Sequence, residues 1–163
     1  MIEVVVAHLG LDRTTNTPVV ILREKEGTRV LPIWIGPAEA SAIAMEMQGM
    51  KPPRPMTHDL LKQVIAGLGA SVRRIMISAL KDKTYFAELW LTRDDHQFQL
   101  DARPSDSIAL ALRVNAPIYT DAALLEQSAV ETGGPGPDST LDADTLRAHL
   151  EKMDPEDFGK FIP

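Results

Sequence analysis

Apolar and polar residues form two groups of three short strand-like segments, and a helical stretch follows each group. In the first group, residues 2–9, 18–23 and 29–35 are rich in β-branched and aliphatic residues, and polar turns separate them. Short turns between short strands predict an antiparallel meander. Because proline cannot donate a ladder hydrogen bond, Pro32 places the third strand at an edge or a bulge.

Two helices are predicted after the first strand group. Gly36-Pro37 opens the first helix, with Glu39 near the positive end of its dipole, and Gly49 stops it after a run of small residues. Thr57 is the predicted N-cap of the second helix, which runs from His58 to about Leu68. A stiff connector that contains three prolines separates the two helices.

The second group repeats this plan. Its strands are predicted at residues 72–80, 84–92 and 96–100. Arg103-Pro104 then opens a helix that runs from Ser107 to about Val114. The last predicted elements are a short closing strand at residues 117–119 and a fourth helix, capped by Asp121, that extends to about Ser128.

The two helix openings align at an offset of 67 residues. Pro37 then matches Pro104, Glu39 matches Asp106, and a run of alternating Ala and aliphatic residues follows both. We interpret the chain as an α+β fold with two antiparallel three-stranded βββα-like units packed as one domain, in which a mixed sheet is one way to join them. Proline and acidic residues are also common in first helical turns, so the alignment alone leaves a duplication open.

The charge changes sharply near the C-terminus. The net charge of the chain is −6, but residues 121–163 carry −7 and residues 1–120 carry +1, with a basic stretch of +5 at residues 51–83. A near-neutral body with a basic stretch is compatible with a phosphate backbone or with an ordinary solvated surface. The Gly- and Pro-rich residues 131–140 are a predicted flexible linker between a domain at residues 1–130 and an acidic helical tail at residues 141–163.

Several classes of protein are excluded by what the sequence lacks. There is no cysteine, so disulfides, thiolate metal sites and cysteine nucleophiles are absent. No apolar run approaches the ~18 residues that a membrane span needs, and the first residues read as a strand rather than a secretion signal, so we expect a cytoplasmic protein without a membrane partner. No dinucleotide-binding, Walker or nucleophile-elbow motif is present, and no organic cofactor is expected.

Two polar clusters share one arrangement at a predicted helix start. In residues 54–59 and 101–106, an arginine precedes a proline, and a hydroxyl and then a carboxylate follow. Free N–H groups at a helix N-terminus attract anions, and an arginine adds a bidentate partner for phosphate or carboxylate. Arg54 and Arg103 are therefore candidate phosphate ligands, and His58 beside Asp59 is a candidate for proton transfer or metal binding.

The same residues also have an ordinary structural interpretation. Thr57 and Ser105 are common helix caps, Asp59 and Asp106 are common first-turn acids, and an arginine can pair with such acids to fix a loop. No His-x-x-x-His or Asp-x-Asp pair is present within residues 1–130, so the ligands of any metal in this domain would have to converge from distant segments.

Three blocks resemble the bifunctional nuclease (BFN) domain family, in order along roughly residues 1–130. They are residues 31–40 (LPIWIGPAEA), 54–60 (RPMTHDL) and 101–111 (DARPSDSIALA). The resemblance implies an α+β fold and, from some plant members, degradation of both DNA and RNA. The acidic tail resembles the variable extensions of actinobacterial members. The polar residues that the family shares in these blocks correspond here to Glu39, Arg54, Thr57, His58, Asp59, Asp101, Arg103, Ser105 and Asp106.

Two functional hypotheses from different classes follow. The first is a nuclease that hydrolyses phosphodiester bonds of DNA or RNA, with Arg54, Thr57, Arg103 and Ser105 binding substrate phosphate. Its catalytic residues would be Glu39, His58, Asp59 and Asp106, with His58 as the general acid. Mg²⁺ or Mn²⁺ is the expected cofactor, with Glu39, Asp59, Asp101 and Asp106 as candidate ligands.

The second hypothesis is a non-catalytic module that binds an anionic ligand or regulates a partner protein through the same helix ends. The small number and wide separation of the carboxylates favour it, as does the overall acidic charge. Under either hypothesis, unpaired edge strands predict a homo-oligomer, most simply a two-fold dimer.

Overall fold

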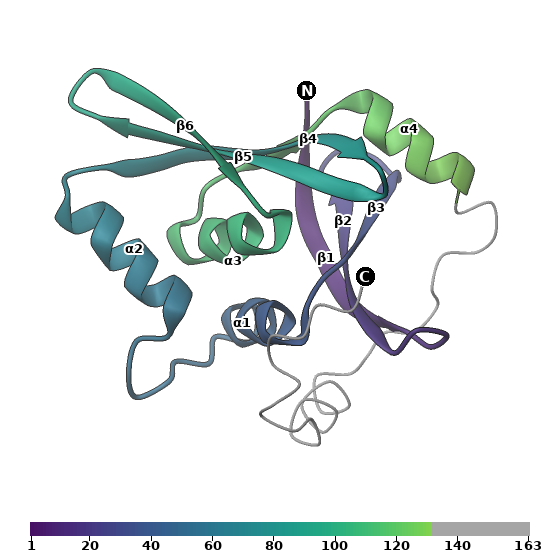
Figure 1. Cartoon of the computed structure of the whole chain (residues 1–163), viewed down its shortest axis with the longest axis horizontal. Coiled ribbons are helices and arrows are strands. Elements are labelled where there is room, and N and C mark those ends of the chain that lie inside the picture. Colours follow the sequence, from purple (N-terminus) through teal and green to yellow (C-terminus); the bar gives the residue numbers. More distant parts are fainter. Residues whose placement is uncertain (132–163) are drawn as a thin grey trace.

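A short strand near the end of the domain joins the two strand groups into one sheet. The computed structural model describes residues 1–131, and Figure 1 shows their arrangement. The sheet has seven strands in the order β3-β2-β1-β7-β4-β5-β6. They are β1 (Ile2–Asp12), β2 (Thr17–Glu24), β3 (Val30–Trp34), β4 (Ser71–Lys81), β5 (Thr84–Arg93), β6 (His96–Ala102) and β7 (Ile118–Thr120).

The strand β7 makes the sheet mixed. It pairs antiparallel with β1 and parallel with β4, while all other neighbours are antiparallel. The predicted α+β class is therefore confirmed, and the predicted closing strand lies in the middle of the sheet. The interpretation as two βββα units stays a prediction. Pro32 lies in β3, which is an edge strand as its missing N–H requires.

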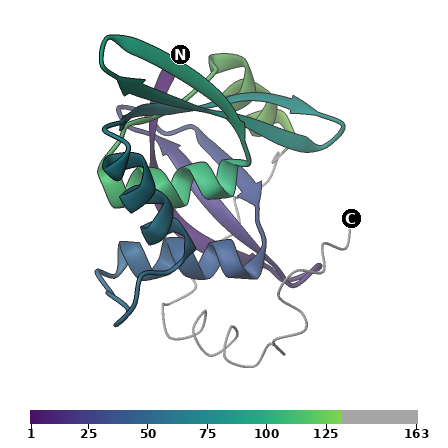
Figure 2. The ribbon, with the colours of Figure 1, turned by 60° about the vertical axis from the view of Figure 1, so that its left-hand side comes forward.

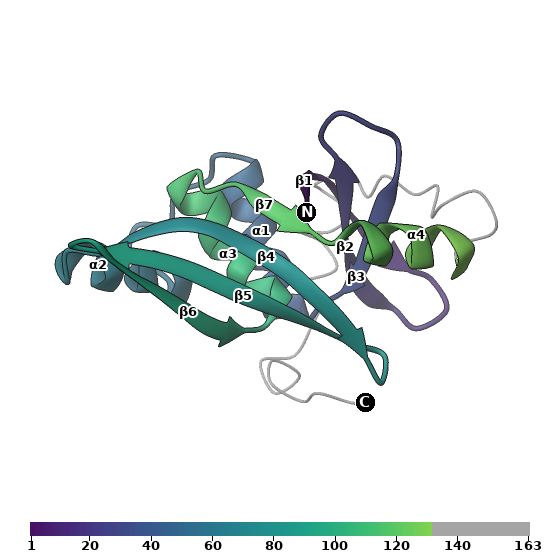
Figure 3. The same ribbon diagram turned by 90° about the horizontal axis from the view of Figure 1, so that it is seen from above.

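Three of the four helices lie on one side of the sheet (Figure 1). The helices are α1 (Pro37–Met47), α2 (Thr57–Gly67), α3 (Pro104–Val114) and α4 (Ala122–Glu131). Helix α4 packs against β3, apart from the other three (Figure 3). Strand β2, which is second from the edge, is buried at five consecutive residues, 18–22. Since neighbouring side chains of a strand point to opposite faces, β2 is covered on both sides.

One hydrophobic core spans both strand groups. Its fully buried side chains come from β1 to β4 and from α1, α3 and α4, and they include Leu22, Leu31, Ile43, Ile75, Ile77, Ile108, Leu110 and Leu125. Helix α2 differs from the other helices, since His58 is its only buried residue. The core therefore fixes α1 and α3 firmly, while polar contacts play a larger part in holding α2.

The helix boundaries agree with the sequence patterns in most places and correct them in two. Gly49 has a φ of +66° and follows the end of α1, as predicted, and Asp121 Oδ1 accepts a hydrogen bond from Ala123 N–H at 3.2 Å at the start of α4. The prediction that Thr57 caps α2 is wrong, because Thr57 is the first helical residue and Met56 is the N-cap. Helix α3 begins at Pro104, three residues before the predicted start.

The C-terminal predictions lie largely outside the described residues. Helix α4 extends to Glu131, which is the first residue of the predicted linker. The remaining linker residues and the predicted acidic tail at residues 141–163 are outside the described part of the chain. Within residues 1–131, no helix is long and apolar enough to cross a membrane.

Candidate functional site

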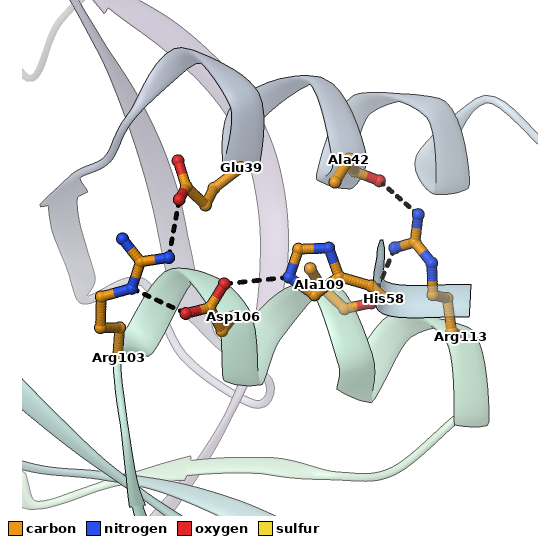
Figure 4. A network of polar contacts seen from close by, with 7 residues as sticks. All are labelled: Glu39, Ala42, His58, Arg103, Asp106, Ala109 and Arg113. Atoms are coloured by element: carbon orange, nitrogen blue, oxygen red, sulfur yellow. Dashed lines mark hydrogen bonds and ion pairs between the residues drawn. The ribbon is translucent and has the colours of Figure 1, made fainter. Parts of the chain in front are cut away.

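The first turns of α1 and α3 lie next to each other. The two helices pack side by side and run in the same direction, so their N-terminal ends meet at one end of the domain (Figures 2 and 4). The buried residues of α1 include three alanines, Ala40, Ala42 and Ala44, whose small side chains permit close packing. This arrangement places Glu39, in the first turn of α1, near Asp106, in the first turn of α3.

Arg103 bridges these two carboxylates. Its Nη2 lies 2.7 Å from Oε1 of Glu39, and its Nε lies 2.7 Å from Oδ2 of Asp106 (Figure 4). Arg103 is the N-cap residue of α3, so its side chain projects from the helix end, where it is 61% exposed. These two carboxylates raise the pKa of Arg103, with the Asp106 hydrogen bond as the main cause. The Nη1 group makes no hydrogen bond with residues 1–131.

Gly36 makes room for the carboxylate of Glu39. A Cβ atom at residue 36 would lie 2.4 Å from Oε2 of Glu39, which is far inside van der Waals contact. The absence of this atom lets the Glu39 side chain fold back over the start of its own helix, where backbone N–H groups are unpaired. The glycine therefore supports the conformation in which Glu39 contacts Arg103.

His58 adds a titratable ring to this network from a third helix. Its Nε2 lies 3.0 Å from Oδ1 of Asp106, and its side chain is only 10% exposed. Asp106 thus holds His58 with one oxygen and Arg103 with the other (Figure 4). The hydrogen bond with His58, reinforced by Arg103, lowers the pKa of Asp106 below its usual value. An ionised Asp106 accepts a hydrogen bond from the imidazole when Nε2 carries a proton, and it thereby orients the ring.

A second cluster beside the first ties the three helices together. Arg113, whose side chain is only 4% exposed, donates from Nε to Oδ1 of Asp59 at 2.7 Å. Its other nitrogens donate to the carbonyl oxygens of Ala109 and Ala42 at 2.8 and 3.1 Å. One guanidinium thus contacts α1, α2 and α3, and Figure 4 shows its position next to the His58 network. Three acceptors for one buried guanidinium satisfy most of its donors.

Asp59 has two structural contacts within this second cluster. Its Oδ2 accepts the N–H of Met56 at 2.9 Å, and its Oδ1 accepts Arg113 Nε. The Met56 hydrogen bond, followed by that of Arg113, lowers the pKa of Asp59. Lys62 adds a further link, because its Nζ donates to the carbonyl oxygen of Arg113 at 2.8 Å. Asp59 therefore fixes the start of α2 and positions His58, its neighbour in sequence.

The sequence-predicted residues divide into groups in the structure. Glu39, His58, Arg103 and Asp106 form one connected network, which we call the His58 network. Asp59 belongs to the Arg113 cluster, and Ser105 is buried in the first turn of α3. Arg54 and Thr57 are exposed and make no hydrogen bond or ion pair with any residue that the structure describes.

Asp101 lies away from the His58 network. In the β5–β6 register, Asp101 pairs with Glu88, while the neighbouring Ala102 pairs with the buried Ala87. Since side chains alternate between the faces of a sheet, Asp101 projects from the face opposite the core. It is exposed, and no residue between 1 and 131 forms a hydrogen bond or ion pair with it.

The predicted metal ligands do not assemble into a cation site. Within the described part of the chain, no group of three or more acidic or histidine side chains is arranged to hold a metal ion. Glu39 and Asp106 lie on either side of Arg103, so a guanidinium occupies the position that a cation would take between them. Asp59 is engaged by Arg113, and Asp101 is on another face. Among residues 1–131, the four predicted ligands are therefore not gathered into one group, and the divalent cation stays a prediction.

Arg113 is not among the residues predicted from the sequence. Its signal is a single charged residue in the last turn of the apolar run Ile108–Val114, at a position that faces the core. A charged residue inside a buried helical stripe indicates a specific partner, because an unpaired buried charge is strongly unfavourable. The identity of that partner, 54 residues away in the sequence, could not be read from the pattern.

Comparison with known proteins assigns the chain to a family. The sequence profile described as the bifunctional nuclease domain matches residues 20–133. The chain belongs to the bifunctional nuclease domain family. An uncharacterized protein of Mycobacterium tuberculosis is 41% identical over 162 residues, which cover 96% of this chain and 97% of that protein.

Plant members of the family are more distant and longer. Bifunctional nuclease 1 of Arabidopsis thaliana is 26% identical over 136 residues, which cover 76% of this chain and 42% of the plant protein. Bifunctional nuclease 2 of Oryza sativa subsp. japonica is 28% identical over 130 residues, with 77% and 40% covered. The chain thus spans about two fifths of the length of these plant nucleases.

Proposed function

We propose that this bifunctional nuclease domain hydrolyses phosphodiester bonds of nucleic acid at the His58 network. The observation that carries the proposal is the Asp106 carboxylate, which holds an imidazole at 3.0 Å with one oxygen and a solvent-facing guanidinium at 2.7 Å with the other. A paired imidazole is a competent proton donor, and an exposed guanidinium is a competent phosphate ligand. The nuclease names of the plant relatives support this reaction class.

Each residue of the network has a role in this proposal. The free Nη1 of Arg103 binds a phosphate oxygen, and Glu39 holds the guanidinium in place. Asp106 orients His58, which gives a proton to the leaving oxygen as the bond between phosphorus and that oxygen breaks. Water adds to phosphorus, and its proton passes to Glu39, the carboxylate on the other side of Arg103. None of these steps uses a metal ion bound only by protein side chains.

The surface charge supports a nucleic-acid partner. Lys51, Arg54, Arg73, Lys81 and Lys83 lie in the basic stretch 51–83 and are exposed. Solvated lysine and arginine side chains contact a phosphate backbone without regard to base sequence. We expect this contact to weaken steeply as salt rises, and we expect the protein to act in the cytoplasm.

A non-catalytic anion-binding module is the second candidate function. One observation favours it: both carboxylates of the His58 network are already paired with Arg103 or His58, and His58 itself is buried. In this alternative, Arg103 binds a phosphorylated or carboxylated ligand and no bond is broken. The two candidates share the anion-binding step and differ in turnover.

A cleavage assay on the full chain separates the two functions. Single- and double-stranded DNA and RNA are incubated with wild type, Asp106→Ala and Asp101→Ala, in Mg²⁺, Mn²⁺ or EDTA. We expect cleavage by wild type and by the Asp101 variant, and a loss of at least ~100-fold for the Asp106 variant, since removing a general-acid partner costs about that factor. Oligonucleotide binding without cleavage under every condition would instead support the non-catalytic module. Comparison of Mg²⁺, Mn²⁺ and EDTA also tests whether cleavage needs the predicted divalent cation, which substrate phosphate oxygens would then help to bind.

A further inference from the structure

Helix α2 turns an apolar stripe toward solvent. Leu60, Val64 and Leu68 recur every four residues, so they lie on one face of the helix, and their exposed fractions are 55%, 47% and 64%. Leu61 flanks this row, and Met56 precedes it at the N-cap; both are also exposed. We call these five residues the α2 stripe. Large apolar patches of this kind mark interaction sites in soluble proteins.

The orientation of α2 is fixed by contacts on its opposite face. His58 bonds to Asp106, Lys62 bonds to the carbonyl oxygen of Arg113, and Ile65 packs against the core. These residues alternate with those of the stripe at helical spacing, so the stripe points away from the domain. An amphipathic helix normally turns its apolar face inward. Here the inward face holds His58 and Lys62 beside Ile65, and the apolar face has no covering element among residues 1–131.

The stripe is self-complementary. It contains no charged side chain, so it carries no electrostatic feature that would select a different protein as a partner. Its central row reads Leu, Val, Leu at positions 60, 64 and 68, which is the same in both directions. Two copies placed antiparallel about a two-fold axis therefore set Val64 against Val64 and Leu60 against Leu68. Antiparallel packing also opposes the two helix dipoles favourably.

We propose that α2 forms a two-fold interface between two copies of this chain through the α2 stripe. Two stripes together expose apolar surface on the order of 1,000 Å², which is about the size at which a specific interface becomes stable. In such an isologous contact both subunits use the same surface, so assembly stops at two subunits and no further copy can bind through it. The expected assembly is a dimer that dissociates on dilution in the micromolar range.

This contact also bears on the His58 network. Helix α2 contributes His58 to the network but buries no other residue in its own domain. A second helix packed on its outer face reduces the motion of α2 and so steadies the His58–Asp106 contact. The interface does not depend on nuclease activity, because its primary measurement is the mass of the particle.

Sedimentation of the full chain over a range of concentrations tests the proposal. We expect wild type to move from monomer to dimer, and Leu60→Glu and Leu68→Glu to remain monomeric, because each places two like charges in the apolar contact. Leu100→Glu is the matched control: Leu100 is 46% exposed and lies on the unpaired edge strand β6. We expect this variant to dimerise like wild type. At a concentration too low for dimers to form, all four proteins should show the same circular dichroism and melting midpoint, since the substituted side chains are exposed in the monomer.

A single-cysteine experiment locates the contact. The chain has no cysteine, so Val64→Cys introduces one thiol per subunit at the proposed centre of the interface. Mild oxidation should convert this variant to a disulfide-linked dimer at least tenfold faster than Gln63→Cys, whose side chain lies about a quarter turn away. A monomeric wild type at every concentration overturns the proposal. So does a dimer that survives Leu60→Glu but is lost in Leu100→Glu, since that pattern assigns assembly to the β6 edge.

Discussion

His58 Nε2 lies 3.0 Å from Asp106 Oδ1, although 48 residues separate the two in sequence. The contact joins α2 to α3 at the end where α1 and α3 also begin. Arg103 extends it to Glu39, which is 64 residues away. The resulting network joins residues of the three blocks 31–40, 54–60 and 101–111, and substitutions in it should separate function from folding.

Arg103 is expected to affect ligand binding far more than folding. Arg103→Met removes the guanidinium that faces solvent, so affinity for a short oligonucleotide should fall roughly tenfold or more, as the loss of a charge-assisted phosphate contact predicts. The free energy of unfolding should fall by no more than ~1 kcal/mol, because the ion pairs of a side chain that is 61% exposed are screened by water. Fluorescence titration at low salt measures the first quantity and urea unfolding the second.

The control for this variant is Arg93→Met, which removes an exposed arginine at the end of β5. This variant should lose only the small affinity that any single surface charge contributes to binding nucleic acid. The dependence of its affinity on salt should stay close to that of wild type. Equal losses of affinity in the two variants would show that Arg103 contributes only as one of many surface charges.

Arg113 is expected to show the opposite behaviour. Arg113→Met leaves Asp59 and the carbonyl oxygens of Ala42 and Ala109 without their shared donor in a buried region. We expect a loss of about 2–4 kcal/mol in the free energy of unfolding, since removing one partner of a buried ion pair leaves an uncompensated charge. Urea unfolding beside Arg103→Met measures the difference. If the two arginine variants lose the same small amount, the buried cluster does not hold the helices together.

The contrast between these two arginines shows where sequence analysis succeeds. The openings of α1 and α3 depend on local signals, namely a proline in the first turn followed by an acidic residue, and the structure confirms both helices. The end of α1 near Gly49 also depends on a local signal, because a backbone φ of +66° is a conformation that favours glycine. The alignment of the two openings matched Glu39 with Asp106, but the contact of both carboxylates with Arg103 depends on how α1 and α3 pack.

Other features could not be predicted because distant contacts determine them. The sequence gives no sign that Arg113 meets Ala42, which is 71 residues away. On the inward side of α2, the ring of His58 and the ammonium group of Lys62 contact Asp106 and the Arg113 carbonyl oxygen, and neither partner can be identified from the residues of α2 alone. Here, polar bonds from α3 outweigh the usual preference for apolar burial.

Acid should weaken the fold through Asp59 and Asp106. Their folded-state pKa values are lowered below the ordinary value of about 3.9, so both carboxylates contribute stability that is fully present above pH ~4. That contribution is lost as the pH falls below 4 through the lowered folded pKa values. We expect the free energy of unfolding to decline over this range in wild type and less steeply in Asp59→Asn. Urea unfolding at a series of pH values measures the slopes, and identical slopes would contradict this assignment.

Gly36→Ala should disconnect Glu39 from Arg103 without unfolding the domain. The added Cβ would lie 2.4 Å from Oε2 of Glu39, and the flexible end of that side chain can move aside at little cost. The free energy of unfolding should therefore fall only slightly, by the ~1 kcal/mol or less that alanine costs at an N-cap. A double-mutant cycle with Glu39→Gln and Arg103→Met measures their coupling, which should be about 1 kcal/mol in wild type and near zero with G36A. Coupling of the same size in both backgrounds would mean that Gly36 has no part in holding Glu39 over the start of its helix.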